Sequence, residues 1–203
     1  MGVSFTERMK GFVSVGAADS QAGYDLGRDA EHRLMFELTI DVDDVDRFVS
    51  EPSHEGRAVG YLESDVLGGR FEVERGWFNL FVEQDDPSSR QMLYRLWFSG
   101  PGGNPMTFTG VKHVHDDPGL DVWRDTSTLH VRILDGHVHP GDDETPIAAG
   151  IITIHLQDFA KQLTTFRSTG SRPGHDLGGF GRLFLGELWD VYGTVFSDRT
   201  VDS

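Results

Sequence analysis

Apolar and polar residues alternate along much of the first 154 residues, which is the pattern of strands that bury one face. Residues 34–42 show it most clearly, because Leu, Phe, Leu, Ile and Val fill the even positions and Glu, Thr and Asp fill the odd positions from 37 onward. The same pattern, with Gly- and Pro-rich turns between segments, predicts eight strands. They are expected at residues 3–15, 34–42, 57–66, 70–83, 91–99, 106–115, 127–135 and 147–154.

The even spacing of these strands, with no helix predicted between them, favours an antiparallel meander in which sequential strands are neighbours. We expect a mainly β fold, a lipocalin-like meander barrel, with a two-sheet β-sandwich as the alternative. Within 70–83 the apolar phase slips by one residue at Gly76. Phe71 and Val73 are in step before it, and the apolar residues at 78, 80 and 82 are in step after it. Such a slip predicts a β-bulge.

After residue 154 the apolar pattern changes to that of amphipathic helices. Apolar residues at 156, 159, 160, 163 and 166, and again between 180 and 191, predict two helices joined by a Gly- and Pro-containing loop. We therefore expect a single domain over residues 1–203, with antiparallel β-structure at 3–154 and two packed helices at 155–193.

The composition excludes several classes of function. The 203 residues include 33 acidic and 18 basic side chains, a net charge of −15, and no cysteine. Without a basic surface, nucleic-acid binding is not expected. Without cysteine, disulfides and thiolate chemistry are impossible. No apolar run is long enough to span a membrane and no signal peptide is evident, so we expect a cytoplasmic protein.

Several predicted strands are apolar on both faces. Trp77 alternates with Phe78, and Trp97 alternates with Phe98. Such strands are covered on both sides, here by a barrel interior on one face and by the C-terminal helices or a subunit partner on the other. An interior of this kind suits an apolar small molecule, while a plain core without a cavity is the alternative. The expected ligand-binding residues are Trp77, Asn79, Tyr94, Trp97, Phe108 and Lys112.

Lys112 stands out because it shares a strand face with apolar residues such as Phe108 and Val114. A lysine that points inward needs a carboxylate partner, for which Asp125 is the candidate. The alternative is a lysine that reaches solvent from the end of its strand.

Two histidine pairs, His113 with His115 and His137 with His139, have the i, i+2 spacing with which strand residues can reach one metal ion. Acidic residues follow each pair. Both pairs also lie at strand ends beside acidic turns, where polar residues are ordinary. A metal-dependent enzyme is therefore an alternative function only, and we predict no metal and no cofactor.

Blocks across nearly the whole chain resemble a known module of unassigned function. They are FTERMKGFVSVG (5–16), GWFNLF, MLYRLWF, FTGVKHV and DPGLDVWRDTSTLHVRI within 76–133, and the segments 150–170 and 181–193. The module accompanies cholesterol-oxidase-like oxidoreductases of the glucose–methanol–choline type and α/β-hydrolase or patatin-like lipid enzymes. The resemblance implies sterol or lipid metabolism and a flavoenzyme or hydrolase partner, but supplies no catalytic residues.

Common catalytic motifs are missing from the sequence: there is no dinucleotide-binding G-x-G-x-x-G after a strand, no Walker loop, no G-x-S-x-G and no H-E-x-x-H. We therefore expect a non-enzymatic binding or accessory module for a sterol or lipid. The alternative is a docking or homo-oligomerisation domain without a ligand.

Overall fold

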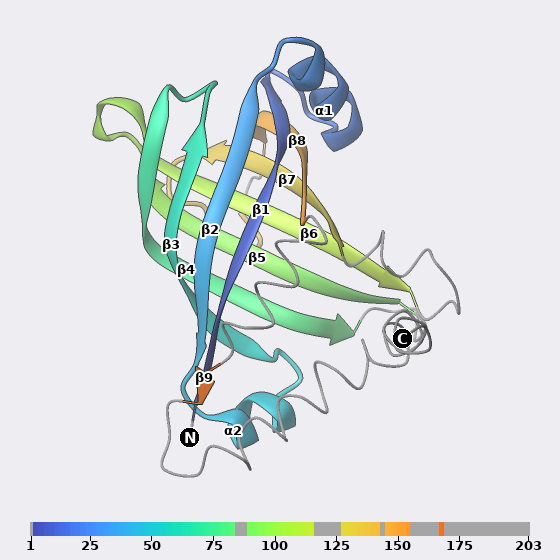
Figure 1. The fold of residues 1–203 in the computed structure, drawn as a ribbon, viewed down its shortest axis with the longest axis vertical. Helices are drawn as coiled ribbons and strands as arrows, with labels where there is room; N and C mark the ends of the chain where they lie inside the picture. The colour runs from blue at the N-terminus through green and yellow to red at the C-terminus, as the bar shows by residue number, and fades with distance from the viewer. Residues whose placement is uncertain (1, 84–88, 116–126, 143–144, 155–166, 169–203) are drawn as a thin grey trace, which may run out of the picture.

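The computed structural model describes residues 2–83, 89–115, 127–142, 145–154 and 167–168. In this part of the chain, eight antiparallel strands form a closed meander barrel (Figure 1). The strands are β1 (Val3–Val15), β2 (Arg33–Val42), β3 (Glu55–Ser64), β4 (Gly69–Glu83), β5 (Ser89–Ser99), β6 (Pro105–His115), β7 (Thr128–Asp135) and β8 (Pro146–Thr153), and the short β9 (Arg167–Ser168) pairs with the start of β1.

The predicted barrel is confirmed, and the sandwich alternative is wrong. Two sheets would need unpaired edges, whereas β1 pairs with β2 along most of its length and with β8 over Lys10–Val15. These pairings close the sheet into one ring. The predicted strand bounds agree with the structure to within two residues, because alternation of buried and exposed positions runs without a break through strands such as β2.

The β-bulge predicted in β4 is confirmed next to Gly76, where the pairing with β5 gains one residue between Val73 and Arg75. A second bulge lies between Asn79 and Val82 and was not predicted. The extra residue turns both Leu80 and Phe81 into the core, with Phe81 at a φ of 48°. The expectation that residue 82 continues the inward phase is therefore wrong, because Val82 is only partly buried.

The prediction that no helix interrupts the strands is also wrong. Helix α1 (Ser20–Asp29) connects β1 to β2, and α2 (Val45–Ser50) connects β2 to β3. Each begins at an aspartate whose carboxylate accepts a hydrogen bond from a backbone N–H of the first turn: Asp19 from Ala22, and Asp44 from Arg47. The two helices lie at opposite ends of the β1–β2 pair (Figure 1).

The two helices predicted at 155–193 lie outside the described residues, except that residues 167–168 of this range form β9. A short 3₁₀ turn (Pro101–Gly103) joins β5 to β6. Among the helices in the described ranges, none has the length and apolar character that a membrane crossing requires.

The lumen of the barrel is filled by inward-pointing side chains, as in other eight-stranded barrels of small diameter. Phe36, Leu96, Phe98 and Phe108 expose none of their surface, and Phe78 exposes 1%. At this level the lumen is filled by these side chains. Val45 and Phe48 of α2 add to the same core.

Two glycines let α1 lie directly on the strand backbones of β1 and β8. A Cβ added to Gly23 would overlap the carbonyl oxygen of Ala149, and one added to Gly27 would overlap the backbone of Val13. Neither neighbour is a side chain that can turn away. The helix therefore approaches the barrel more closely than any larger residue would allow.

We expect Gly23→Ala to lower the free energy of unfolding by about 1–3 kcal/mol, the usual effect of overpacking a rigid contact. Alanine is the better helix former by about 1 kcal/mol, so a loss of stability reports the overlap with β8 alone. Urea denaturation measures the change. Gly69→Ala is the control, because the nearest atom to its added Cβ is a ring carbon of Phe71 at 3.7 Å. A Gly23→Ala protein as stable as the wild type would contradict the packing described.

Candidate functional site

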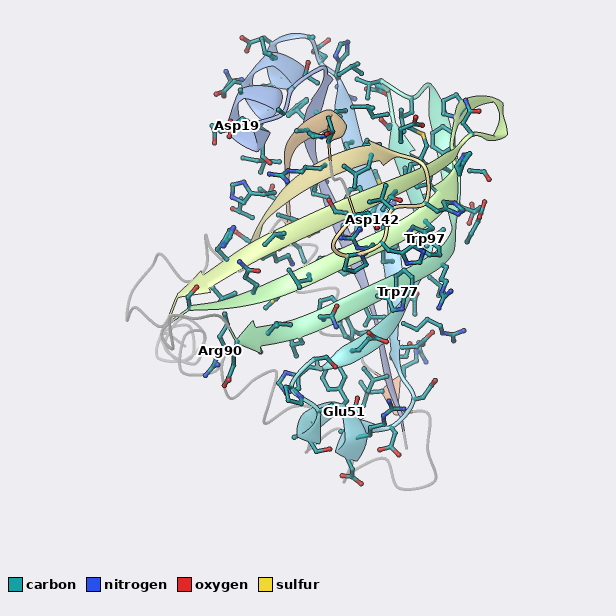
Figure 2. The ribbon with its side chains drawn as sticks, turned by 180° about the vertical axis from the view of Figure 1, so that it is seen from behind. Asp19, Glu51, Trp77, Arg90, Trp97 and Asp142 are labelled. Carbon is teal, nitrogen blue, oxygen red and sulfur yellow. The ribbon has the colours of Figure 1, made fainter. Side chains whose placement is uncertain are left out.

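The six expected ligand-binding residues do not share one pocket. Alternation places the side chains of three of them, Tyr94, Phe108 and Lys112, in the lumen, where all are buried. Trp77 and Trp97 lie on the outer wall of the barrel (Figure 2), and Asn79 lies on the same face of β4 as Trp77, two residues further along. Tyr94 and Trp97 are three positions apart on β5, and an odd step places their side chains on opposite faces of the strand. The inner and outer sets therefore have to be considered separately.

A polar network crosses the lumen. Nζ of Lys112 donates to Oε1 of Glu7 at 2.8 Å, and the Tyr94 hydroxyl donates to Oε2 of the same carboxylate at 2.6 Å. Each of the three residues exposes 3% of its surface. Burial, and then the adjacent Glu7 carboxylate, hold the pKa of the Tyr94 hydroxyl well above its usual value, so it remains a donor.

Lys112 thus points inward as expected, but the partner in the structure is Glu7, 105 residues away in the sequence. The earlier candidate, Asp125, lies outside the described residues. Glu7 is on β1 and Lys112 on β6, with β7 and β8 between them in the ring. The contact therefore spans the barrel rather than joining neighbouring strands.

This inner network is surrounded by aromatic rings. The Tyr94 ring lies 5.0 Å from that of Phe78 and 5.7 Å from that of Phe36, and Lys112 Nζ is 5.4 Å from the centre of the Tyr94 ring. A charge pair desolvated to this extent contributes little net stability, yet leaving one member unpaired is costly. We interpret the network as a structural element that fixes the register of the lumen residues.

We expect Lys112→Met to lower the free energy of unfolding by about 3–5 kcal/mol, because it leaves the Glu7 carboxylate buried without its cation. The double variant Glu7→Leu/Lys112→Met should recover most of this loss, since it removes both charges. Denaturant unfolding of the wild type, of Glu7→Leu, of Lys112→Met and of the double variant gives the coupling free energy between the two side chains. Additive effects of the two substitutions would contradict a direct pair.

On the outer wall, Trp97 is the centre of an aromatic cluster. Its ring meets that of Trp77 edge-on at 5.1 Å, stacks on His137 at 5.0 Å, and meets His139 edge-on at 4.5 Å. Figure 2 shows Trp77 and Trp97 side by side on the outer wall. The cluster joins strands β4 and β5 to that connection.

Hydrogen bonds hold the connection against the wall. The carbonyl of Val138 accepts from Nη1 of Arg95 at 2.9 Å and from Nε1 of Trp97 at 3.3 Å. The hydroxyl of the buried Thr107 accepts from the Val138 N–H and donates to the Gly136 carbonyl. Residues 136–139 are therefore an ordered part of the outer surface.

Of the histidines proposed as metal ligands, the structure describes the side chains of His113, His137 and His139, and these do not meet at one point. His137 and His139 pack on Trp97, and His113 contacts His130 on β7, with ring centres 5.9 Å apart. The side chain of His115 lies outside the described residues. Within the part of the chain that the structure describes, no three His, Asp or Glu side chains converge as metal ligands.

Beside the aromatic cluster lies a hollow of about 560 Å³, here called the wall groove. It runs over the outer face of β4 to β7, and its lining includes Trp77, Leu93, Val111, His113, His130 and Arg132. Ser20, at the start of α1, borders it, as do His139 and Pro140 of the β7–β8 connection.

Strand register explains why these residues meet. One row of paired positions across the four strands is Trp77, Arg95, Thr109 and Arg132, and the next is Asn79, Leu93, Val111 and His130. Gln91 pairs with His113 beside the second row. Directly paired side chains on one face of a sheet lie within about 5.5 Å of each other at Cβ, so each row is a continuous surface.

The wall groove is polar at one end and ring-lined at the other. Val111 and Leu93 form an apolar centre between His130 on β7 and Trp77 on β4. Burial, and secondarily the charge of His113, lower the pKa of His130 below its usual 6.5, whereas Asp19 opposes the shift. These surroundings thus favour the neutral form of His130.

Of the residues that line this groove, the sequence predicted Trp77, Asn79 and Tyr94, whose side chain itself points into the lumen, but not His130 or Arg132. A signal was present, because His130 and Arg132 occupy the polar face of a strand whose other face is Leu129, Val131 and Ile133. Polar residues on an outer face are ordinary, however, and only the register with β5 and β6 places these two beside an apolar patch.

Comparison of the chain with protein-family models, with curated proteins and with solved structures finds no match. The chemistry of the site is therefore inferred from its own residues.

The lowered pKa of His130 predicts a pH dependence of stability. Because the folded pKa lies below the unfolded value of 6.5, the unfolded state binds more protons in mildly acid solution. The contribution of His130 to the free energy of unfolding is therefore constant above about pH 7.5 and falls as the pH drops through and below 6.5.

His130→Gln removes this contribution, so its stability should fall less steeply than that of the wild type between pH 7.5 and pH 5. Urea unfolding at several pH values measures both curves, with pH 8 as the reference where the imidazole is neutral in both states. Parallel curves would show that His130 titrates alike in the folded and unfolded chain.

Proposed function

We propose that this barrel is a binding module for a small organic molecule with an apolar body, and that the molecule binds in the wall groove. The observation that carries the proposal is the hollow itself: an apolar centre of Leu93 and Val111, with Trp77 at one end and polar side chains at the other. Ligand sites usually combine such an apolar lining with a few convergent polar groups, in volumes of roughly 300–1,000 Å³.

The wall groove is a better candidate than the lumen level occupied by the phenylalanines. There Phe36 and Phe108 expose none of their surface, and the polar groups of Glu7, Tyr94 and Lys112 bond to one another. In the wall groove, by contrast, about 560 Å³ lies next to Trp77 and Val111. We therefore propose that the lipid-like ligand binds on the outer wall of the barrel and not in its interior, where the sequence analysis expected it.

The docking alternative receives less support from the described ranges. A partner surface would be a contiguous apolar patch of several hundred Å². The large hydrophobic side chains exposed in these ranges are instead divided among β1, α1, α2 and β3: Val15, Leu26, Val49 and Val59. Association with a lipid-metabolising flavoenzyme or hydrolase remains part of the proposal, as the context in which such a ligand would be met.

Filling the wall groove tests the proposal. We expect the full chain to bind members of a panel of fatty acids, sterols and aromatic acids, with quenching of tryptophan fluorescence and a mass increase in native mass spectrometry. Val111→Trp should abolish binding, because a bulky ring would occupy the apolar centre. Val59→Trp is the matched control, an outward valine on β3 that is 36% exposed and does not line the groove.

The proposal is overturned if no member of the panel binds the wild type at millimolar concentration. It is also overturned if Val111→Trp binds as the wild type does. Far-UV circular dichroism and thermal unfolding of both valine variants establish that each is folded.

A further inference from the structure

The ionisable side chains that line the wall groove are mostly basic, whereas the protein as a whole is acidic. The chain carries 33 acidic against 18 basic residues, a net charge of −15. The ionisable side chains that line the groove are instead two arginines and three histidines, with Glu55 as the single carboxylate among the described lining residues: Arg95, Arg132, His113, His130 and His139. Such a local reversal attracts an anion to a protein that otherwise repels it.

Arg132 differs from Arg95, the other arginine of this set, whose guanidinium donates to the Val138 carbonyl. Six other arginines lie within 4 Å of a carboxylate: Arg8, Arg28, Arg47, Arg57, Arg70 and Arg90. Within the described residues, no carboxylate or carbonyl oxygen is paired with the guanidinium of Arg132. Thr109, its register partner on β6, adds a hydroxyl on the same face. A planar guanidinium with free donors is suited to a carboxylate or another oxyanion.

Resting on the function proposed above, we propose that the ligand of the wall groove is an organic anion. Its oxyanion head binds Arg132 and the imidazoles of His130 and His113 on β7 and β6. Its apolar body crosses Val111 and Leu93 toward Trp77 on β4. This assignment favours fatty or aromatic acids over neutral sterols.

The strand spacing sets the size of the ligand. From β7 to β4 there are three intervals of about 4.8 Å, so head and tail lie roughly 14 Å apart. A straight-chain acid of about ten carbons, or an aromatic acid with a short linker, covers this span. Longer acyl chains would extend beyond Trp77.

An anion at this place also couples binding to pH. His130 is surrounded by the cationic Arg132 and by His113, with Asp19 at the start of α1 acting in the opposite sense. Arg95, His139 and Glu55 are the other charged or imidazole side chains among the described lining residues of the groove. An anionic head stabilises the imidazolium, so binding takes up a proton and strengthens as the pH falls through the neutral range.

Two probes that differ only in the head group, one anionic and one neutral, test whether the groove prefers an anion. We expect decanoate to bind the full chain at least about tenfold more tightly than 1-decanol, as one charge-assisted hydrogen bond of about 1.4 kcal/mol or more implies. Arg132→Gln should remove this preference and leave 1-decanol within twofold of its wild-type affinity. Arg8→Gln on β1, outside the groove, is the control and should change neither affinity.

Decyl sulfate tests the pH dependence, because its head stays ionised and only the protein titrates. Its affinity should rise between pH 7.5 and pH 5.5, and His130→Gln should weaken this rise. Isothermal titration calorimetry in buffers of different ionisation enthalpy measures the proton uptake.

The outcomes separate the two proposals. Equal affinities for decanoate and 1-decanol, both lost in Val111→Trp, overturn the anion assignment and leave the groove as a binding site. A preference for decanoate that survives Arg132→Gln also overturns the assignment. Failure of all three probes to bind overturns both proposals for ligands of this size.

Discussion

Closure of one antiparallel sheet into a ring is the constraint on which the rest of the structure depends. Once β1 pairs with both β2 and β8, every strand residue must face either the lumen or the outer wall. Neighbouring residues such as Leu96 and Trp97 therefore end on opposite sides of the wall. The same strands supply the packed interior and the surface on which a ligand site can form.

Charged groups are accommodated differently in the lumen and on the outer wall. Inside, aromatic and aliphatic side chains are buried against one another. The one described ion pair there, Glu7 with Lys112, is tolerated because Tyr94 also bonds to the carboxylate. Such a pair contributes specificity more than stability, since any shift in register would separate the charges in an apolar surrounding. Outside, Arg132 keeps its charge in contact with solvent and remains available to a ligand.

The outer surface is shaped by connections as much as by strands. The β7–β8 connection lies on the wall because the Val138 carbonyl accepts two hydrogen bonds from β5 side chains. Helix α1 lies against β1 and β8 because Gly23 and Gly27 have no side chain. Both connections border the wall groove, so the strands provide its floor and the irregular segments provide its rim.

The sequence by itself determined the strands, their order and the bulge next to Gly76, because period-two alternation is a local property that a single strand displays. It did not reveal α1 and α2, since α1 buries two glycines instead of large apolar side chains and α2 has only six residues. It identified Lys112 as unusual but could not name Glu7, which is distant in the chain. Only the tertiary structure decided which residues share a face of the barrel, because that depends on register between strands, and register is fixed by ring closure and by bulges that add one residue to one strand alone.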